Sequence, residues 1–257
     1  MKSYQTKTIC ISNQKGGVGK TTSAINIASF LGITETPTLL IDMDPQANAT
    51  TGLGIEYKKN KSIYDVLINN TNIKHCITKT KIDFLDIVPS DTRLAGAEIE
   101  LVSMFTREAV LQKSLKEIIG KYKYIIIDSP PSLGLLTINI LTAAHSIIIP
   151  IQCEYYALEG LSQLLNTIRL VQKNLNKKLE IEGILMTMYD SRLNLSQQVL
   201  KEVQDYFGDK VYQTLINRNV KLGEAPSHGK PIVLYDAAST GSQNYMDLVS
   251  EILNQNG

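Results

Sequence analysis

Residues 12–22, which read SNQKGGVGKTT, hold the residue types that bind phosphate. The end of this stretch fits the phosphate-loop pattern G-x-x-x-x-G-K-[ST]. The first glycine of that pattern is absent, because Gln14 stands at its position. Lys15 follows, so the loop carries a second lysine ahead of the usual one, Lys20. The spacing therefore predicts a phosphate loop of a variant kind, and the extra lysine needs a reason.

The chemistry expected of this loop is the binding of a nucleoside triphosphate together with Mg²⁺. Glycine tolerates the backbone dihedrals that let successive N–H groups converge on phosphate oxygens. The helix that follows adds the positive end of its dipole. Lys20 would reach the β- and γ-phosphates, Thr21 would give its hydroxyl to Mg²⁺, and Thr22 would contact the α-phosphate. The backbone groups expected to converge are those of Gly16, Gly17, Val18 and Gly19.

Three aspartates at the ends of two apolar runs are candidates to act beside the metal. A nucleotide hydrolase needs carboxylates near its metal ion. YIIIDSPP contains Asp128, which can hold a Mg²⁺-bound water, and LLIDMDPQ contains Asp42 and Asp44. Asp44 lies past the apolar run, where it can orient an attacking water. Aspartates also form turns and helix caps, and for Asp42 this structural role is as well supported as a functional one.

The elements that must position these residues alternate between strands and helices. Apolar runs rich in β-branched residues suit strands that are covered on both faces of a parallel sheet. Helical patterns lie between them, over 21–31 and over 158–175. This alternation predicts one α/β domain over 1–257, with a doubly wound, mostly parallel sheet and helices on both faces. The predicted strands cover 8–12, 38–44, 84–89, 124–128, 146–151 and 181–187.

Composition limits the class of protein more than its partners. With 43% hydrophobic and 20% charged residues, the chain is typical of a soluble globular protein. The formal net charge of +1 argues neither for nor against a nucleic-acid partner. Cys10, Cys76 and Cys153 form no CxxC pair, which disfavours a disulfide framework or a zinc site. The N-terminus lacks the apolar core of a signal peptide, and no run approaches the ~18 apolar residues of a membrane span.

Five motifs in order make a family resemblance specific. KGGVGKTT, LLIDMDPQANAT, YIIIDSPPSLG, MTMYDSRLNLSQQV and NRNVKLGEAPSHGKPI follow one another across nearly the whole chain. Together they resemble the ParA/Soj branch of the deviant Walker A ATPases, the chromosome- and plasmid-partitioning proteins related to MinD. The resemblance implies a weak, partner-stimulated ATPase that uses ATP and Mg²⁺.

The resemblance gives the early lysine a role. In this family the lysine at the position of Lys15 reaches across to the nucleotide of the other subunit, so that two protomers sandwich two ATP molecules. A second cation near the γ-phosphate stabilises developing charge, as an arginine finger does in trans. A homodimer that depends on ATP is therefore expected, and a solvated surface lysine is the alternative. By the same resemblance, Asp44 is the aspartate needed for hydrolysis and Asp128 is the Walker B-like residue.

The resemblance also implies contacts outside the loop. INRNVKLGEAPS matches the family's adenine-side loop and would place Asn217 and Asn219 near the base, although the family more usually has proline where this chain has Asn217. Arg192 matches an arginine tied to non-specific binding of double-stranded DNA by the ATP dimer. Further candidates for that face, each of which is equally well explained as a solvated charge, are Arg218, Lys221 and Lys230.

The expected function is segregation of a chromosome or plasmid by a cytoplasmic, nucleoid-associated ATPase with a ParB/Spo0J-like partner. The predicted first strand starts near residue 7, so neither an N-terminal helix-turn-helix domain nor operator binding is expected. A MinD-like membrane-cycling ATPase is one alternative, but the tail TGSQNYMDLVSEILNQNG has no Lys or Arg for a membrane-binding helix, so no membrane partner is expected. A metabolic enzyme of the same superfamily is another, but it would not need YDSRLNLS.

Overall fold

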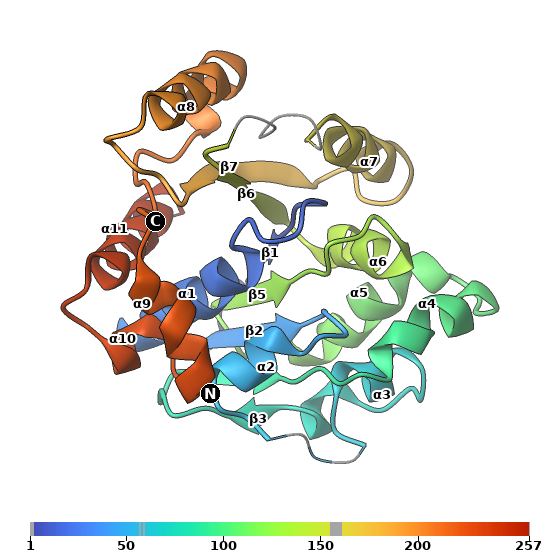
Figure 1. Cartoon of the computed structure of the whole chain (residues 1–257). Helices are drawn as coiled ribbons and strands as arrows, with labels where there is room; N and C mark the ends of the chain where they lie inside the picture. The colour runs from blue at the N-terminus through green and yellow to red at the C-terminus, as the bar shows by residue number, and fades with distance from the viewer. Residues whose placement is uncertain (1–2, 57, 59, 155–160, 257) are drawn as a thin grey trace.

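Seven strands of the described residues form one sheet in the order β3-β4-β2-β5-β1-β6-β7 (Figure 1). The structure is a computed structural model that describes residues 3–56, 58, 60–154 and 161–256. Neighbouring strands pair in parallel, except that β3 pairs with β4 in antiparallel fashion. The strands are β1 (Lys7–Ile11), β2 (Thr38–Asp42), β3 (Thr78–Lys79), β4 (Leu85–Val88), β5 (Tyr124–Asp128), β6 (Ser146–Gln152) and β7 (Glu180–Thr187).

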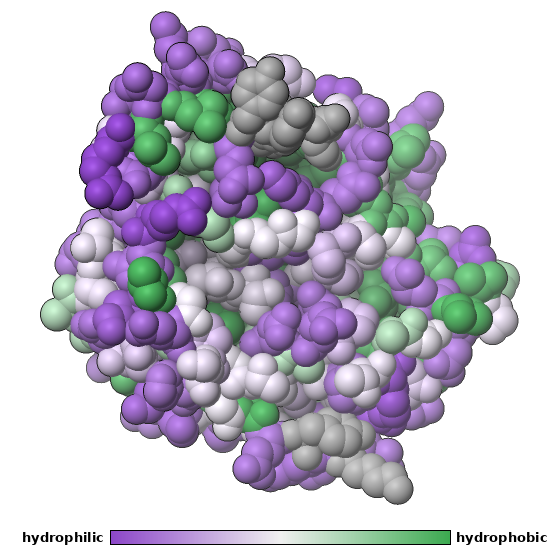
Figure 2. All heavy atoms as spheres, in the orientation of Figure 1, coloured by the Kyte–Doolittle hydropathy of each residue, from purple (hydrophilic) through white to green (hydrophobic). Residues whose placement is uncertain are grey.

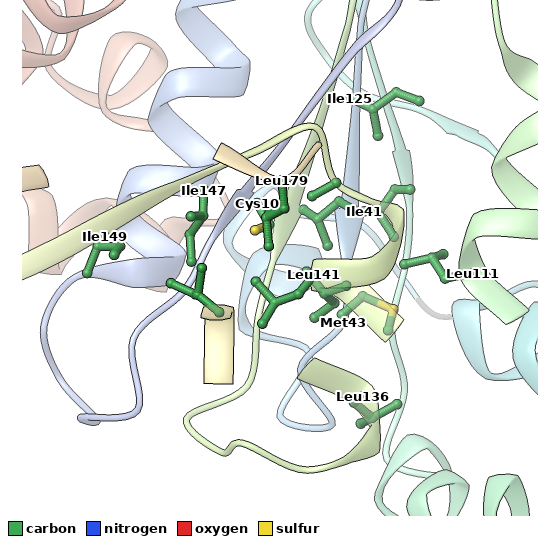
Figure 3. Packing of buried hydrophobic residues seen from close by; sticks show 14 of the residues in the cluster. Cys10, Ile41, Met43, Leu111, Ile125, Leu136, Leu141, Ile147, Ile149 and Leu179 are labelled. Carbon is green, nitrogen blue, oxygen red and sulfur yellow. The ribbon is translucent and has the colours of Figure 1, made fainter. Parts of the chain in front are cut away.

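Alternate residues of each central strand enter two separate cores, one on each face of the sheet. On one face, Ile9 and Ile11 pack with residues of α1 (Lys20–Ile33) and α11 (Thr240–Gln255). On the other face, Cys10 packs among side chains that include Leu136 and Leu141 of α6 (Leu135–Ala143) (Figure 3). The same core includes residues of α7 (Leu161–Asn174). Burial on both faces explains why these strands read as continuous apolar runs.

The predicted doubly wound α/β fold is confirmed, and the element boundaries shift by a few residues. The six predicted strands are present, while β3 was missed because a strand of two residues carries no apolar pattern. The predicted helix over 21–31 begins one residue earlier, and the described part of the predicted helix over 158–175 is α7, since 158–160 lie outside the described residues. The other α-helices of the described residues are α2 (Asn48–Gly52), α3 (Ile63–Leu67), α4 (Leu94–Val102), α5 (Val110–Leu115), α8 (Asn194–Phe207), α9 (Val220–Glu224) and α10 (Ile232–Tyr235).

The C-terminal helix α11 packs on the sheet rather than standing free. Tyr245, Leu248, Val249 and Ile252 lie on its buried side and contact the core on the α1 face. The apolar face that the sequence places on one side of the tail is therefore used inside the molecule. Among the described residues, no helix combines the length and the apolar character needed to cross a membrane.

A bulge in β7 lets the chain pack closely against the segment that follows α8. The pairing runs from Ile147 with Ile181 to Ile148 with Gly183, so one residue of β7 is extra. The Tyr212 ring lies directly over Gly183, where an added Cβ would come within 2.4 Å of a ring carbon. Glycine at this position therefore allows the close approach of a buried aromatic ring.

We expect Gly183→Ala to lower the free energy of unfolding by about 1–3 kcal/mol, because the Tyr212 ring must move to admit a methyl group. Gly96→Ala is the matched control, since a Cβ on this helical glycine meets only a Glu100 side-chain oxygen at 3.4 Å. The control should be neutral or more stable by up to about 1 kcal/mol. Urea unfolding of both variants measures the difference, and equal effects would contradict this account of the packing.

Candidate nucleotide site

The loop between β1 and α1 takes a shape that only glycine adopts easily. Gly17 and Gly19 have φ angles of 76° and 85°, in the left-handed region that side chains disfavour. Gly19 is also the N-cap residue of α1, so the free N–H groups of the first helical turn follow directly. The loop is tied to β7, because the Thr187 hydroxyl donates to the Val18 carbonyl at 2.9 Å. A loop that is held in place, requires glycine and leads into a helix N-terminus is suited to binding an anion.

Lys20 lies across this loop as a buried cation. Its Nζ donates to the carbonyl oxygen of Lys15 at 2.9 Å, and the residue is only 7% exposed. Burial lowers the pKa of Lys20, while the charges of Asp128 and Asp44 act in the opposite direction. The ammonium group therefore has acidic neighbours and lies within its own loop.

A cavity of about 330 Å³, here called the phosphate cavity, opens between the loop and the end of β2. The structure thus brings Asp44, which is 6% exposed, beside the glycines, lysine and threonines of the loop. Val18 is buried and is absent from the lining. The lining residues are Gly16, Gly17, Gly19, Lys20, Thr21, Thr22, Asp44, Gln46, Asn48, Pro131 and Met188.

The Asp128 carboxylate is buried without a hydrogen-bond partner among the described residues, at both of its oxygens. Burial raises the pKa of Asp128 well above its usual range, and the charge of Asp42 adds to that effect. The nearby Thr21 hydroxyl and Lys20 ammonium oppose it. An unpaired buried carboxylate beside a threonine hydroxyl offers the oxygen donors that Mg²⁺ prefers. The residues present therefore fit this cation.

Asp42 is hydrogen-bonded to the loop after β2, which supports the structural one of the two roles that its sequence left open. Its Oδ2 accepts hydrogen bonds from the backbone N–H and the hydroxyl of Thr50 at 2.8 and 2.7 Å. Its Oδ1 accepts from the Asp44 N–H at 3.1 Å. Burial raises the pKa of Asp42 to about 6, although these hydrogen bonds lower it. Asp42 thus shapes the turn that carries Asp44 into the phosphate cavity.

Lys15 lies apart from the phosphate cavity of its own chain. Its Nζ is 3.2 Å from Oε2 of Glu154, and the two side chains are 36% and 47% exposed. Lys15 does not line the phosphate cavity, whereas Lys20 does. The two lysines of the loop therefore occupy different environments, one buried and one at the surface. An exposed ion pair such as Lys15–Glu154 contributes little stability, so it can open at small cost.

A second cavity, of about 470 Å³ and here called the base cavity, adjoins the first. The two share Gly19, Thr22 and Met188 in their linings. Met188 has a φ of 52°, which is unusual for a residue with a side chain and marks a sharp turn between the cavities. The predicted residues Asn217 and Asn219 both line it, among Gly19, Thr22, Thr187, Met188, Ile216, Asn217, Arg218, Asn219, Val220, Leu222, Gly223, Glu224 and Tyr245.

Two of the four basic residues predicted for DNA lie near one carboxylate. The Arg192 side chain is 86% exposed, and its Nη2 is 2.7 Å from Oδ2 of Asp190. Arg192 holds the pKa of Asp190 at about 2, and Arg218 contributes to the same shift. Hydrophilic side chains gather beside α8, at the left of the face in Figure 2. Arg192 and Arg218 therefore share a neighbourhood at the surface.

The other two basic residues are not brought into that group by any contact among the described residues. Lys221 is paired instead with Glu224 on α9, at 2.9 Å. Lys230 is exposed and follows α9. Only Arg192 and Arg218 thus have a shared neighbour that supports a common surface.

Several residues of this site were missed by sequence reasoning. Glu154 lies just after β6 and Thr187 is the last residue of β7, so both lie at the carboxyl edge of the sheet. The same position at the end of a strand identified Asp128. Tyr245 was recognised only as part of the apolar face of the tail, yet it lines the base cavity. Met188 and Asn244 carry no signal in the sequence. Met188 matters through its backbone turn, and Asn244 matters because its Oδ1 accepts from the distant Asn217 N–H at 3.1 Å.

We expect Asp128→Asn to stabilise the nucleotide-free protein at pH 8 and to weaken the effect of Mg²⁺ on nucleotide affinity. The folded pKa of this carboxyl lies above its unfolded value of 3.8, so its stabilising contribution is present at low pH and is lost as pH rises through the folded pKa. The gain from the variant should therefore be largest at pH 8 and shrink toward pH 5. Urea unfolding across this range tests the prediction, and a gain independent of pH would refute it.

Comparison with known proteins agrees with this geometry. A family model described as an AAA domain matches residues 6–181. The chain is 57% identical over 247 residues to the sporulation initiation inhibitor protein Soj of Bacillus subtilis (strain 168), which covers 96% of this chain and 98% of that protein.

Two solved structures share the fold over nearly the whole chain. A cobyrinic acid a,c-diamide synthase from Mycobacterium smegmatis with bound ADP and magnesium has a TM-score of 0.85 at 35% identity, covering 97% of this chain and 95% of that one. A putative plasmid partition protein from Borrelia burgdorferi B31 bound to AMPPNP has a TM-score of 0.83 at 28% identity, and the match covers 98% of this chain and 99% of that one. With the five motifs and the 57% identity to Soj, these findings show that the chain belongs to the ParA/Soj family of chromosome-partitioning ATPases.

Proposed function

We propose that this chain is an ATPase that dimerises with ATP, binds double-stranded DNA non-specifically and segregates a chromosome or plasmid with a ParB/Spo0J-like partner. The observation that carries the proposal is the separation of the two loop lysines. Lys20 is buried in the phosphate cavity, whereas Lys15 lies outside it against an exposed carboxylate. A cation that is not needed by its own nucleotide is available to a second one.

Within one protomer, the loop glycines and Lys20 hold the phosphates in the phosphate cavity. Thr21 and Asp128 are the residues that would hold Mg²⁺, directly and through a water, and the ion would neutralise phosphate charge. Asp44 is the candidate to orient the attacking water. Its Oδ1 accepts from the Gln46 N–H at 2.9 Å, and none of the hydrogen bonds among the described residues uses its Oδ2. A buried carboxylate with one oxygen held and the other free suits that task.

Between protomers, Lys15 supplies its charge to the nucleotide of the partner. The exposed pair with Glu154 opens at little cost, and an ammonium group gains more beside a triphosphate than beside one carboxylate. ATP then becomes part of the dimer interface, so the dimer forms with ATP and dissociates after hydrolysis. The rate of hydrolysis would then determine how long the dimer persists.

The proposed DNA contact is supported by residues at the surface, and the proposed partner is supported by the family to which the chain belongs. Arg192 and Arg218 lie near Asp190, and a two-fold dimer would present this group twice. A cytoplasmic location on the nucleoid follows from such binding. The 57% identity to Soj over nearly the whole chain, against 35% to the diamide synthase, favours partitioning over a metabolic reaction. The helix α11 packs on the core and contains no Lys or Arg, and both observations disfavour a MinD-like membrane role.

We expect Lys15→Ala and Lys20→Ala to separate nucleotide binding from dimerisation. Lys15→Ala should bind ATP with an affinity within about threefold of wild type, because its ammonium group lies outside the phosphate cavity. It should stay monomeric with ATP and hydrolyse little. Lys20→Ala should lose at least ~100-fold in ATP affinity, since a charge-assisted contact to a buried phosphate disappears. Calorimetry and size-exclusion chromatography measure the two properties.

The control for loss of a surface charge is Lys74→Ala, because Lys74 is exposed, pairs with Glu117 and lines neither cavity. It should behave as wild type in both measurements. The trans role of Lys15 is wrong if Lys15→Ala still dimerises with ATP as wild type does.

We expect Arg192→Ala to weaken DNA binding by the ATP-bound dimer equally for all sequences, because phosphate contacts carry no base information. Each lost phosphate contact should flatten the slope of log K against log [salt] by about 0.9, so the dimer, which loses two, should show a change of roughly 1.8. Asp190→Asn should strengthen binding, since it frees Arg192 from its carboxylate while an amide oxygen can still accept from the Arg192 N–H. Salt titrations on unrelated duplexes test both, and identical slopes for wild type and the two variants would exclude Arg192 from the DNA surface.

A further inference from the structure

The helix α4 carries apolar side chains on two sides, and the core covers one of them. Its buried side is formed by Leu94, Ala97 and Leu101. Ile99 and Val102 lie on another side of the helix and are 79% and 56% exposed. A helix that is apolar on more than one side is typically buried on each of them. The exposed side of α4 is therefore a candidate contact surface.

Phe105 extends this exposed side beyond the end of the helix. It is 95% exposed, and the loop that carries it is held at both ends. The Arg107 guanidinium donates to the Val102 carbonyl at 3.0 Å, and the Lys113 ammonium donates to the Thr106 hydroxyl. Thr106 has a φ of 55°, so the chain turns sharply just after Phe105. The exposed position of Phe105 is thus set by the contacts of its neighbours.

Ile99, Val102 and Phe105 form one patch, here called the α4 surface. Side chains three residues apart lie on the same side of a helix, and Phe105 continues the row that Ile99 and Val102 begin. Figure 2 shows hydrophobic side chains at the right edge of the molecule, where Figure 1 places α4 and the loop after it. Three such side chains expose on the order of 400 Å² of apolar surface. A contiguous apolar patch of this size is often functional.

The charge beside the α4 surface is negative. Glu98 and Glu100 flank Ile99, and the helix itself contains no Lys or Arg. Residues 94–108 hold three glutamates and one arginine, and that arginine is paired with Glu108 at 3.0 Å. The surface therefore has an apolar centre with acidic side chains next to it.

The size and the charge of the α4 surface discriminate between its possible occupants. A stable pair of folded proteins buries about 800 Å² on each partner, roughly twice the apolar area here. A second copy placed on a two-fold axis would also bring the same glutamates close to each other. Duplex DNA and anionic membranes carry negative charge, which these glutamates repel. A short helix with apolar and basic side chains fits both the area and the charge.

We propose that the α4 surface is a docking site for an amphipathic, basic helical segment of another protein. The apolar side chains of that segment would pack against the α4 surface, and its Lys or Arg side chains would face Glu98 and Glu100. None of the residues of the α4 surface lines the phosphate cavity or the base cavity. The docking site is therefore separate from the candidate nucleotide site, and its test does not depend on ATP.

Two synthetic peptides of about 18 residues, which is five helical turns, test the proposal. Both carry Leu at helical spacing, and the remaining positions are Lys in one peptide and Glu in the other. Fluorescence anisotropy measures their binding to the nucleotide-free full chain. The Lys peptide should bind wild type at least roughly tenfold more tightly than the Glu peptide. Hydrogen exchange should show that the bound Lys peptide protects residues 94–106.

Variants of exposed residues locate the binding. Ile99→Ser combined with Phe105→Ser should weaken binding of the Lys peptide at least roughly tenfold, as truncation of central interface residues does. Leu170→Ser is the matched control, because Leu170 is 62% exposed on α7, and it should bind as wild type does. Glu100→Lys should weaken binding of the Lys peptide and strengthen that of the Glu peptide. Its control, Glu202→Lys on α8, should change both by less than about twofold at physiological salt.

Phe105→Ser alone keeps the test decisive if the double variant does not fold, since Phe105 lies in a loop and contributes almost no buried surface. It should weaken binding of the Lys peptide by roughly threefold or more. Failure of the Lys peptide to bind wild type, or equal binding to wild type and the serine variants, would overturn the inference.

Two further outcomes would assign the α4 surface to a different occupant and so overturn the inference as well. One is a concentration-dependent dimer of the nucleotide-free wild type, seen by sedimentation and lost in the double variant, which would indicate a second copy. The other is binding of wild type to phosphatidylglycerol vesicles that the double variant loses, which would indicate a membrane.

Discussion

The unpaired Asp128 carboxylate at the end of the central strand β5 is the constraint on which the nucleotide site depends. Parallel pairing sets Asp128 opposite both Ile11 at the end of β1 and Asp42 at the end of β2. Two buried carboxylates therefore meet at the edge from which the phosphate loop starts. Burying such charge is costly unless a cation compensates it, and Lys20 is the cation that the chain itself supplies. This edge of the sheet thus holds buried negative charge behind the lining of the phosphate cavity, and a bound metal ion would relieve it.

The two carboxylates accommodate this charge in different ways. Asp42 is satisfied by the Thr50 N–H, the Thr50 hydroxyl and the Asp44 N–H, so it works as a structural anchor. Asp128 has no such hydrogen bonds among the described residues, and the nearby Thr21 hydroxyl and Lys20 ammonium are the groups that favour its charged form. The same strand-end position therefore yields an anchor on β2 and a candidate ligand on β5, and the difference lies in the loops that follow. Two neighbouring aspartates thus give a stable loop in one case and a candidate metal ligand in the other.

Structural features that depend on residues close together in the chain could be predicted from the sequence. The loop over 12–22, the strand-end aspartates and the alternation of strands and helices all follow from local spacing. It left Asp42 open between a structural and a functional role, because the hydrogen bonds that decide this come from Thr50, eight residues further on. Nor could it find Glu154 beside Lys15, or Asn244 beside Asn217, since these contacts join residues 139 and 27 positions apart. Such pairings become visible only when the fold brings distant segments together.

The C-terminal helix α11 shows how such distant contacts connect the base cavity to the core. The Tyr245 hydroxyl is 2.9 Å from the Ser23 hydroxyl of α1, the helix that the phosphate loop opens. Glu251 accepts from the N–H groups of Gln213 and Thr214, just before the stretch that lines the base cavity. With Asn244 on Asn217, one helix therefore holds the phosphate-side helix and the base-side stretch at a fixed separation. A helix whose apolar face is buried in the core in this way is a structural part of the candidate nucleotide site.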